Sequence, residues 1–110
     1  MRIGHHGAVP QDVLPTPERP SVLVHLVGEL DLAAAPDLRT KLAGLLDQGE
    51  RDVVVDLGGV TFFDTSALEP LVEGHHRGLS SGVRLVLCHI PPHVRRVLEI
   101  TGLDRVLETR

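Results

Sequence analysis

Two hydroxyl side chains and a carboxylate stand together near the middle of the chain, in the step Asp64-Thr65-Ser66. They follow a strand-like apolar segment, Val53–Leu57, and a short glycine turn, and they open a segment whose apolar residues recur at helical spacing. A hydroxyl at the start of a helix can cap it by accepting a bond from a backbone amide, or it can accept a phosphoryl group at the surface. The residue types leave both chemistries open, and composition alone favours capping. Asp64 can also serve as a turn former.

A second polar segment, Gly28–Asp31, follows another strand-like segment over residues 22–27. If the two strands are parallel, their carboxyl ends meet at one edge of the sheet. We therefore expect Glu29 and Asp31 to lie close to Thr65. These two carboxylates either form a plain surface turn or contact a partner.

The elements that must position these residues alternate between strands and helices. We predict strands at 22–27, 53–57 and 83–88, helices at 36–46, 66–76 and 92–101, and a short edge element at Val106–Leu107. This order implies right-handed crossovers and an α/β domain with a mostly parallel mixed β-sheet and helices packed against it. Ala8–Leu14 is predicted as an antiparallel N-terminal edge strand, and residues 1–7 as a flexible end.

Glycine, proline and phenylalanine residues mark the expected ends and irregularities. Gly78 is predicted to end the second helix, and Gly102 to cap the third in the left-handed conformation. Pro70 falls inside the second helix, where we expect a slight kink or a loosened first turn. Of the two phenylalanines, Phe62 and Phe63, we expect one in the core and one packed under the loop.

Composition limits the class of protein. The 110 residues are 42% hydrophobic with a formal net charge of −4, which favours a single folded domain that is attracted neither to nucleic acid nor to an anionic membrane. Cys88 is the single cysteine, so no disulfide forms within the chain. The apolar runs have strand length, too short to cross a bilayer. We therefore predict a cytoplasmic protein.

Other chemistries find less support. His75 and His76 are sequential on a helix and point different ways, while His89 and His93 span a strand end and a proline turn. No carboxylate or cysteine joins either pair at ligand spacing, so we predict neither a metal site nor a cofactor. No Gly-x-Ser-x-Gly elbow surrounds Ser66, and no phosphate-binding loop is present. We predict that the protein is not an enzyme.

Three segments in the same order resemble the STAS domain, in particular the stand-alone bacterial anti-sigma factor antagonists. They are Gly28–Asp31, Asp56–Leu68 and Pro92–Leu103. The resemblance covers about Val22 to Leu107 and implies one STAS domain over residues 8–110. It also implies a protein that binds an anti-sigma factor kinase of the histidine-kinase-like ATPase type and thereby releases a sigma factor.

In that family the kinase inactivates the antagonist by phosphorylating a hydroxyl directly after an aspartate, and a metal-dependent serine/threonine phosphatase reverses the modification. The family's Asp-Ser-Ser-Gly pattern falls on Asp64, Thr65, Ser66 and Ala67, so that a threonine and an alanine stand in place of a serine and the glycine. The resemblance implies Thr65 as the phosphoacceptor, with Ser66 as the second candidate. The implied partner surface consists of Glu29, Asp31, Asp64, Ser66, Ala67 and Leu68.

The resemblance admits a second function. A STAS subunit can dock constitutively in a larger assembly, such as a lipid-transport ATPase complex or a stress-sensing scaffold. For the switched antagonist we expect phosphorylation to change the electrostatics of the interface with little refolding, because the new charge joins Asp64 and Glu69 on an acidic surface.

Overall fold

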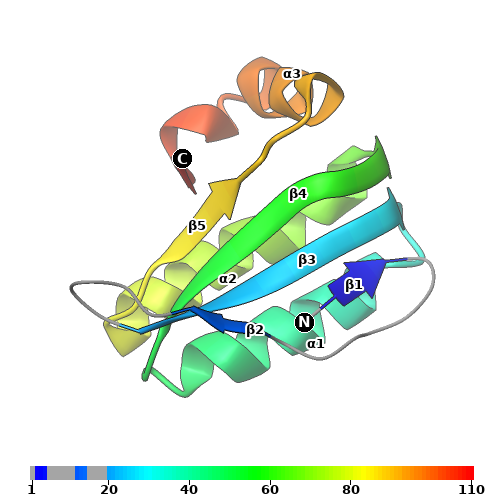
Figure 1. Cartoon of the computed structure of the whole chain (residues 1–110). Coiled ribbons are helices and arrows are strands. Elements are labelled where there is room, and N and C mark those ends of the chain that lie inside the picture. Colours follow the sequence, from blue (N-terminus) through cyan, green and yellow to red (C-terminus); the bar gives the residue numbers. More distant parts are fainter. Residues whose placement is uncertain (1, 5–11, 15–19) are drawn as a thin grey trace.

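The computed structural model describes residues 2–4, 12–14 and 20–110. Within them, one sheet has the strand order β1-β3-β4-β5-β6, with β2 also paired to β3 (Figure 1). The strands are β1 Arg2–Gly4, β2 Asp12–Leu14, β3 Ser21–Leu30, β4 Asp52–Phe63, β5 Leu85–Cys88 and β6 Glu108–Thr109. The helices are α1 Ala35–Asp47, α2 Leu68–Ser81 and α3 Pro92–Thr101, with short 3₁₀ turns η1 Thr65–Ala67 and η2 Leu103–Arg105. The chain is therefore a single α/β domain.

Helices α1 and α2 cover one face of the sheet (Figure 1). The main core includes residues of the sheet and of these two helices, and α3 adds Val94 and Leu98 to it. Alternate residues of the central strands point into this core, among them Val24, Leu26, Val55 and Leu57. All four are fully buried. None of the described helices is long and apolar enough to cross a membrane.

The N-terminal part differs from the prediction. Asp12–Leu14 pair antiparallel with Ser21–Leu23, but residues 8–11 of the predicted edge strand lie outside the described residues. A full antiparallel edge strand is thus not seen. Arg2–Gly4, expected in a flexible end, instead pair parallel with His25–Val27.

The two central strands run further than the sequence predicts. β3 continues to Leu30 and β4 to Phe63, so the expected glycine turn after Leu57 is instead part of a strand. Two register shifts against β3 absorb the extra residues of β4 as bulges. A Cβ at Gly59 would collide with the Val27 side chain, which explains why glycine stands at the first bulge.

The second helix also exceeds its predicted end, because Gly78 serves packing instead of termination. A Cβ at Gly78 would lie 2.8 Å from the carbonyl oxygen of Val83, so the missing side chain lets the chain return closely against α2. The helix ends at Ser81, and Gly82 caps it with φ +78°. Gly102 caps α3 with φ +76°, as the sequence predicts.

Two smaller expectations change as well. Pro70 is the third residue of α2 and falls in its first turn, where amides lack helical partners, so the proline costs the helix interior no bond. The last edge strand is Glu108–Thr109, just after the predicted Val106–Leu107.

Candidate regulatory surface at the end of strand β4

The two polar segments of interest lie side by side. Leu30 pairs with Phe63 across the parallel strands, and the backbone amide of Asp64 donates a hydrogen bond to the carbonyl oxygen of Leu30 at 3.3 Å. The carboxyl ends of β3 and β4 therefore meet, as the sequence predicts. This brings Glu29 and Asp31 to the same end of the sheet as Thr65.

Asp64 caps the turn that carries the hydroxyls. Its backbone is extended, and its Oδ1 accepts a hydrogen bond from the Ser66 amide at 2.8 Å. Its carbonyl oxygen accepts a second bond, from the Ala67 amide at 3.2 Å. Asp64 thus supplies the cap that a hydroxyl residue could have provided, because the helical segment begins with the 3₁₀ turn η1 one residue earlier than predicted.

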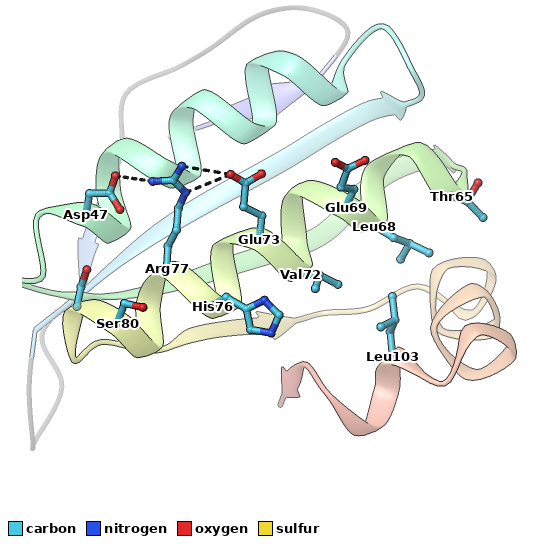
Figure 2. A pocket seen from close by; sticks show the side chains of 11 residues that line it. Asp47, Thr65, Leu68, Glu69, Val72, Glu73, His76, Arg77, Ser80 and Leu103 are labelled. Carbon is cyan, nitrogen blue, oxygen red and sulfur yellow. Dashed lines mark hydrogen bonds and ion pairs between the residues drawn. The ribbon is translucent and has the colours of Figure 1, made fainter.

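The two hydroxyl residues face different grooves. Thr65 is exposed and lies at one end of a groove of about 970 Å³ along α2, which we call the α2 groove (Figure 2). Its lining residues are Asp47, Thr65, Leu68, Glu69, Val72, Glu73, His76, Arg77, Ser80, Ser81 and Leu103. Ser66 is half-buried and lines a smaller groove of about 350 Å³ beside α1, which we call the α1 groove. Leu32, Ala35, Pro36, Arg39, Ser66 and Glu69 line it.

Two residues of the implied partner surface are largely buried. Ala67 is 1% exposed and Leu68 is 6% exposed, and both belong to the main core. The Ala67 side chain thus packs inward, whereas Leu68 still presents an edge to the α2 groove. A partner that contacts this surface meets Thr65, Glu69 and the groove walls more than Ala67.

The carboxylates around Thr65 are engaged in local structure. Asp31 Oδ1 accepts from the Ala34 amide at 3.1 Å and so holds the turn before α1. Glu69 pairs with Arg39 at 3.1 Å, although its side chain is 78% exposed. Glu29 is exposed at the end of β3. The surface is therefore acidic, but Arg39 partly compensates its charge.

Arg39 belongs to an ionic network that joins the two helices. Its Nε donates to Glu73 at 2.8 Å. Arg77 binds the same carboxylate at 3.2 Å and Asp47 at 2.8 Å (Figure 2). The hydrogen bonds from Arg39 and then from Arg77 lower the pKa of Glu73. The sequence analysis did not predict the role of Arg39, because its partners lie on the other helix and no local sequence pattern indicates them.

Two large apolar side chains are exposed near the same end of the molecule. Leu32 is 74% exposed and lines the α1 groove, and Phe62 is 48% exposed and lies opposite Glu29 in the β3–β4 pairing. Phe63 takes the predicted core position at 6% exposure. Exposed apolar groups beside polar ones are typical of protein-binding surfaces.

Comparison with known proteins identifies the family of this chain. A family model described as Mlab, STAS domain, matches residues 16–108. The BtrV protein of Bordetella bronchiseptica is 38% identical over 77 residues, which cover 70% of this chain and 66% of that protein. The anti-sigma-B factor antagonist of Bacillus subtilis is 31% identical over 87 residues, which cover 79% of each. The chain belongs to the STAS domain family, among the anti-sigma factor antagonists.

Solved structures agree with this fold. An anti-sigma factor antagonist of Thermotoga maritima superposes with a TM-score of 0.78 at 24% identity, covering 91% of this chain and 83% of that one. The Bacillus cell fate determinant SpoIIAA, solved in its phosphorylated form, superposes with a TM-score of 0.65 at 22% identity, covering 92% and 91%. At these identities the likeness concerns the fold.

Proposed function

We propose that this protein is an anti-sigma factor antagonist that binds an anti-sigma factor kinase through the surface around η1 and is switched off by phosphorylation of Thr65. The kinase would be of the histidine-kinase-like ATPase type, and a metal-dependent phosphatase would restore the hydroxyl. Both would act in the cytoplasm. The observation that carries the proposal is the exposed Thr65 hydroxyl on a turn that the Asp64 carboxylate holds in place.

Accessibility favours Thr65 over Ser66 as the acceptor. Thr65 is exposed at the end of the larger groove, whereas Ser66 is half-buried beside Arg39 and Glu69. A kinase must bring the γ-phosphate of ATP in line with the attacking hydroxyl oxygen, which requires free approach from outside. The hydroxyl proton leaves, the bond between the γ-phosphorus and the bridging oxygen of ATP breaks, and the phosphoryl group becomes bonded to Thr65 Oγ1 while ADP leaves.

A phosphate on Thr65 would act through charge. It brings about −1.5 to −2 charges at neutral pH. Glu29, Asp31, Asp64 and Glu69 surround this end of the sheet, and Arg39 is already paired with Glu69 and Glu73. A partner surface shaped for a neutral hydroxyl would meet an uncompensated dianion, and each 1.4 kcal/mol of lost binding energy corresponds to about a tenfold loss of affinity.

The test combines modification and binding. The protein is incubated with the candidate kinase and ATP, and the modified residue is mapped by mass spectrometry in the parent, Thr65→Ala and Ser66→Ala. Thr40→Ala is the matched control, because Thr40 is an exposed threonine on α1 outside both grooves. We expect phosphate on Thr65 in the parent, Ser66→Ala and Thr40→Ala, and none in Thr65→Ala.

The affinity of the kinase for variants of this protein then distinguishes the two candidate functions. We expect Thr65→Glu to weaken kinase binding at least about tenfold, with Thr40→Glu unchanged. If Thr65→Glu left the kinase affinity unchanged and no phosphate appeared on Thr65, the proposal of a phosphorylation switch would be wrong. That result would favour instead a STAS subunit that docks constitutively in a larger assembly.

A further inference from the structure

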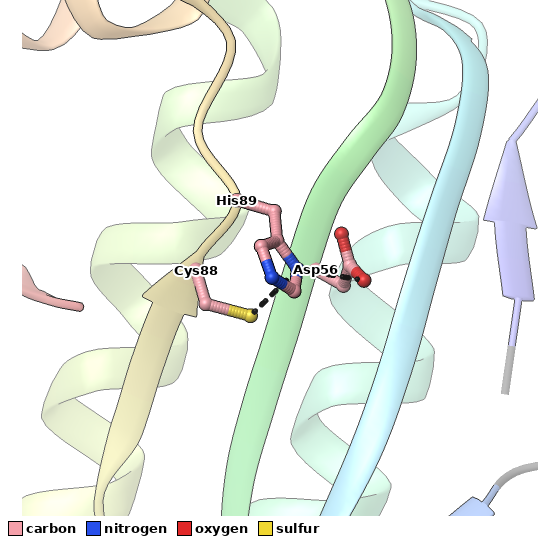
Figure 3. Close-up of side chains that lie close together, drawn as sticks. All are labelled: Asp56, Cys88 and His89. Atoms are coloured by element: carbon pink, nitrogen blue, oxygen red, sulfur yellow. Dashed lines mark hydrogen bonds and ion pairs between the residues drawn. The ribbon is translucent and has the colours of Figure 1, made fainter.

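A row of metal-ligating side chains crosses the sheet on the face opposite α1 and α2. His25 of β3 pairs in register with Asp56 of β4, and Asp56 pairs with Cys88 of β5. Their neighbours along the strands, such as Val55 and Leu87, point into the main core, so these three side chains point the other way. His89 follows Cys88 directly and turns back toward Asp56 (Figure 3).

The donor atoms of three of these residues converge. His89 Nδ1 lies 3.1 Å from Asp56 Oδ2 and 3.7 Å from Cys88 Sγ, and the three ligand atoms all lie within 4.8 Å of one another. Bonds of about 2.0 Å to nitrogen or oxygen and about 2.3 Å to sulfur place tetrahedral zinc ligands roughly 3.3–3.8 Å apart. The two separations from His89 Nδ1 lie close to this range, while the Asp56 and Cys88 ligand atoms lie no more than 4.8 Å apart.

The carboxylate is already oriented for ligation. Asp56 Oδ1 accepts a hydrogen bond from the Gly58 amide at 2.8 Å, which turns Oδ2 toward the two histidines. His25 Nδ1 lies 3.4 Å from that same Oδ2. Such hydrogen bonds to the second oxygen of a ligating carboxylate are typical of metal sites.

The backbone and an adjacent cavity also favour a ligand site. His89 has φ +52°, the one non-glycine residue with positive φ among the described residues, and this conformation aims its ring at Asp56. A cavity of about 300 Å³ opens beside the cluster, lined by His25, Asp56, Gly58, Gly59 and His89 together with Leu26 and Val27. An ion can therefore reach the donors from solvent.

The arrangement does not fit a cysteine nucleophile. In a Cys-His-Asp triad the thiol and the carboxylate address different nitrogens of the imidazole. Here both Cys88 and Asp56 approach His89 Nδ1.

We propose that Asp56 Oδ2, Cys88 Sγ and His89 Nδ1 bind a divalent transition-metal ion of the zinc class, with His25 or water as the fourth ligand. The mixed oxygen, sulfur and nitrogen donors suit zinc and do not suit magnesium or calcium, which take oxygen ligands. The ion would tie β4 to β5 on the face without α1 and α2. The inference does not depend on the proposed function at Thr65.

The test uses the untagged full chain and Co²⁺ as a spectroscopic probe for Zn²⁺. We expect one Co²⁺ per chain, a thiolate-to-cobalt charge-transfer band and visible bands of tetrahedral intensity. Zn²⁺ should displace Co²⁺ and raise the thermal midpoint of unfolding. Cys88→Ser should abolish the charge-transfer band, and His89→Asn, which tolerates positive φ, should lower the affinity at least tenfold.

Matched controls separate this site from other histidines. His76→Gln removes an exposed histidine of α2 outside the cluster. The double change His5→Gln, His6→Gln removes two consecutive histidines that lie outside the described residues. Both should keep the cobalt spectrum and the affinity. The proposal would be overturned if the parent protein bound no Co²⁺. It would also be overturned if Co²⁺ bound without a thiolate charge-transfer band and this binding were lost in the His5→Gln, His6→Gln variant.

Discussion

A single carboxylate holds the turn that presents Thr65. Asp64 Oδ1 accepts the Ser66 amide at 2.8 Å, and the Asp64 carbonyl accepts the Ala67 amide. Substituting a capping aspartate by alanine usually costs about 1 kcal/mol. We expect Asp64→Ala to lower the free energy of unfolding by about that amount, measured by denaturant titration. Asp64→Asn should keep most of the stability, and equal losses in both variants would argue against the cap.

Residue types alone identify part of the site. The Asp64-Thr65-Ser66 step and the Glu29 and Asp31 carboxylates are visible in the sequence, because their spacing after two strands predicts a common edge. The identity of the capping residue was not predictable, because it depends on where the first turn begins.

Contacts between residues that are distant in the sequence cannot be predicted from local residue spacing. Arg39 meets Glu69 and Glu73 across two helices. Asp56 meets His89 across strands 33 positions apart in the sequence. Local spacing therefore predicts no metal ligands, whereas strand register brings them together.

At the scale of elements, hydrophobic periodicity predicted the order of strands and helices, but it did not predict where several of them end. Gly58, Gly59 and Gly78 are typical stop signals in a sequence. In the structure the first two lie in a bulged strand and Gly78 in a helix interior. Only the three-dimensional neighbours of a glycine distinguish a stop from a close approach.

Two helical glycines should therefore respond in opposite directions to the same change. Gly44 in α1 has nothing within 4 Å of an added Cβ, so Gly44→Ala should stabilise the protein by about 0.5–1 kcal/mol. Gly78 in α2 would meet the Val83 carbonyl at 2.8 Å, so Gly78→Ala should destabilise it by about 1–3 kcal/mol. Denaturant unfolding of both variants checks the signs, and a stabilising Gly78→Ala would contradict the close approach.

The network between α1 and α2 predicts a pH dependence. Hydrogen bonds from Arg39 and Arg77 lower the pKa of Glu73 below its ordinary value of 4.5. A carboxyl group whose pKa is lower in the folded state stabilises the fold at pH values above its pKa in the unfolded state. This stabilisation is lost as the pH falls through the pKa of the folded state. We expect Glu73→Gln to flatten the acid limb of stability below about pH 4.5, with Glu50→Gln, an exposed residue outside the network, as control. High salt should weaken the difference, and an unchanged acid limb would contradict the network.

At the scale of the molecule, α1 and α2 cover one face of the sheet (Figure 1). The Thr65 surface lies at the end of β4, and the Asp56 cluster lies on the face opposite α1 and α2. Thr65 and His89 are exposed, whereas the main core takes its residues mostly from the strands and from α1, α2 and α3. A charge added at the exposed Thr65 side chain therefore faces the surface and not the main core.

This separation predicts that phosphorylation changes the surface and spares the fold. Exposed changes usually alter stability by within about 0.5 kcal/mol, which is roughly 2–4 °C in the thermal midpoint of a domain of this size. We expect amide NMR spectra of the bare and phosphorylated forms to differ around η1, the end of β3 and the near end of α2. Resonances of β5 should stay in place, and Thr40→Glu should perturb α1 alone. Shifts throughout the sheet, or a midpoint change well above that range, would mean that the switch acts by refolding and not by interface charge.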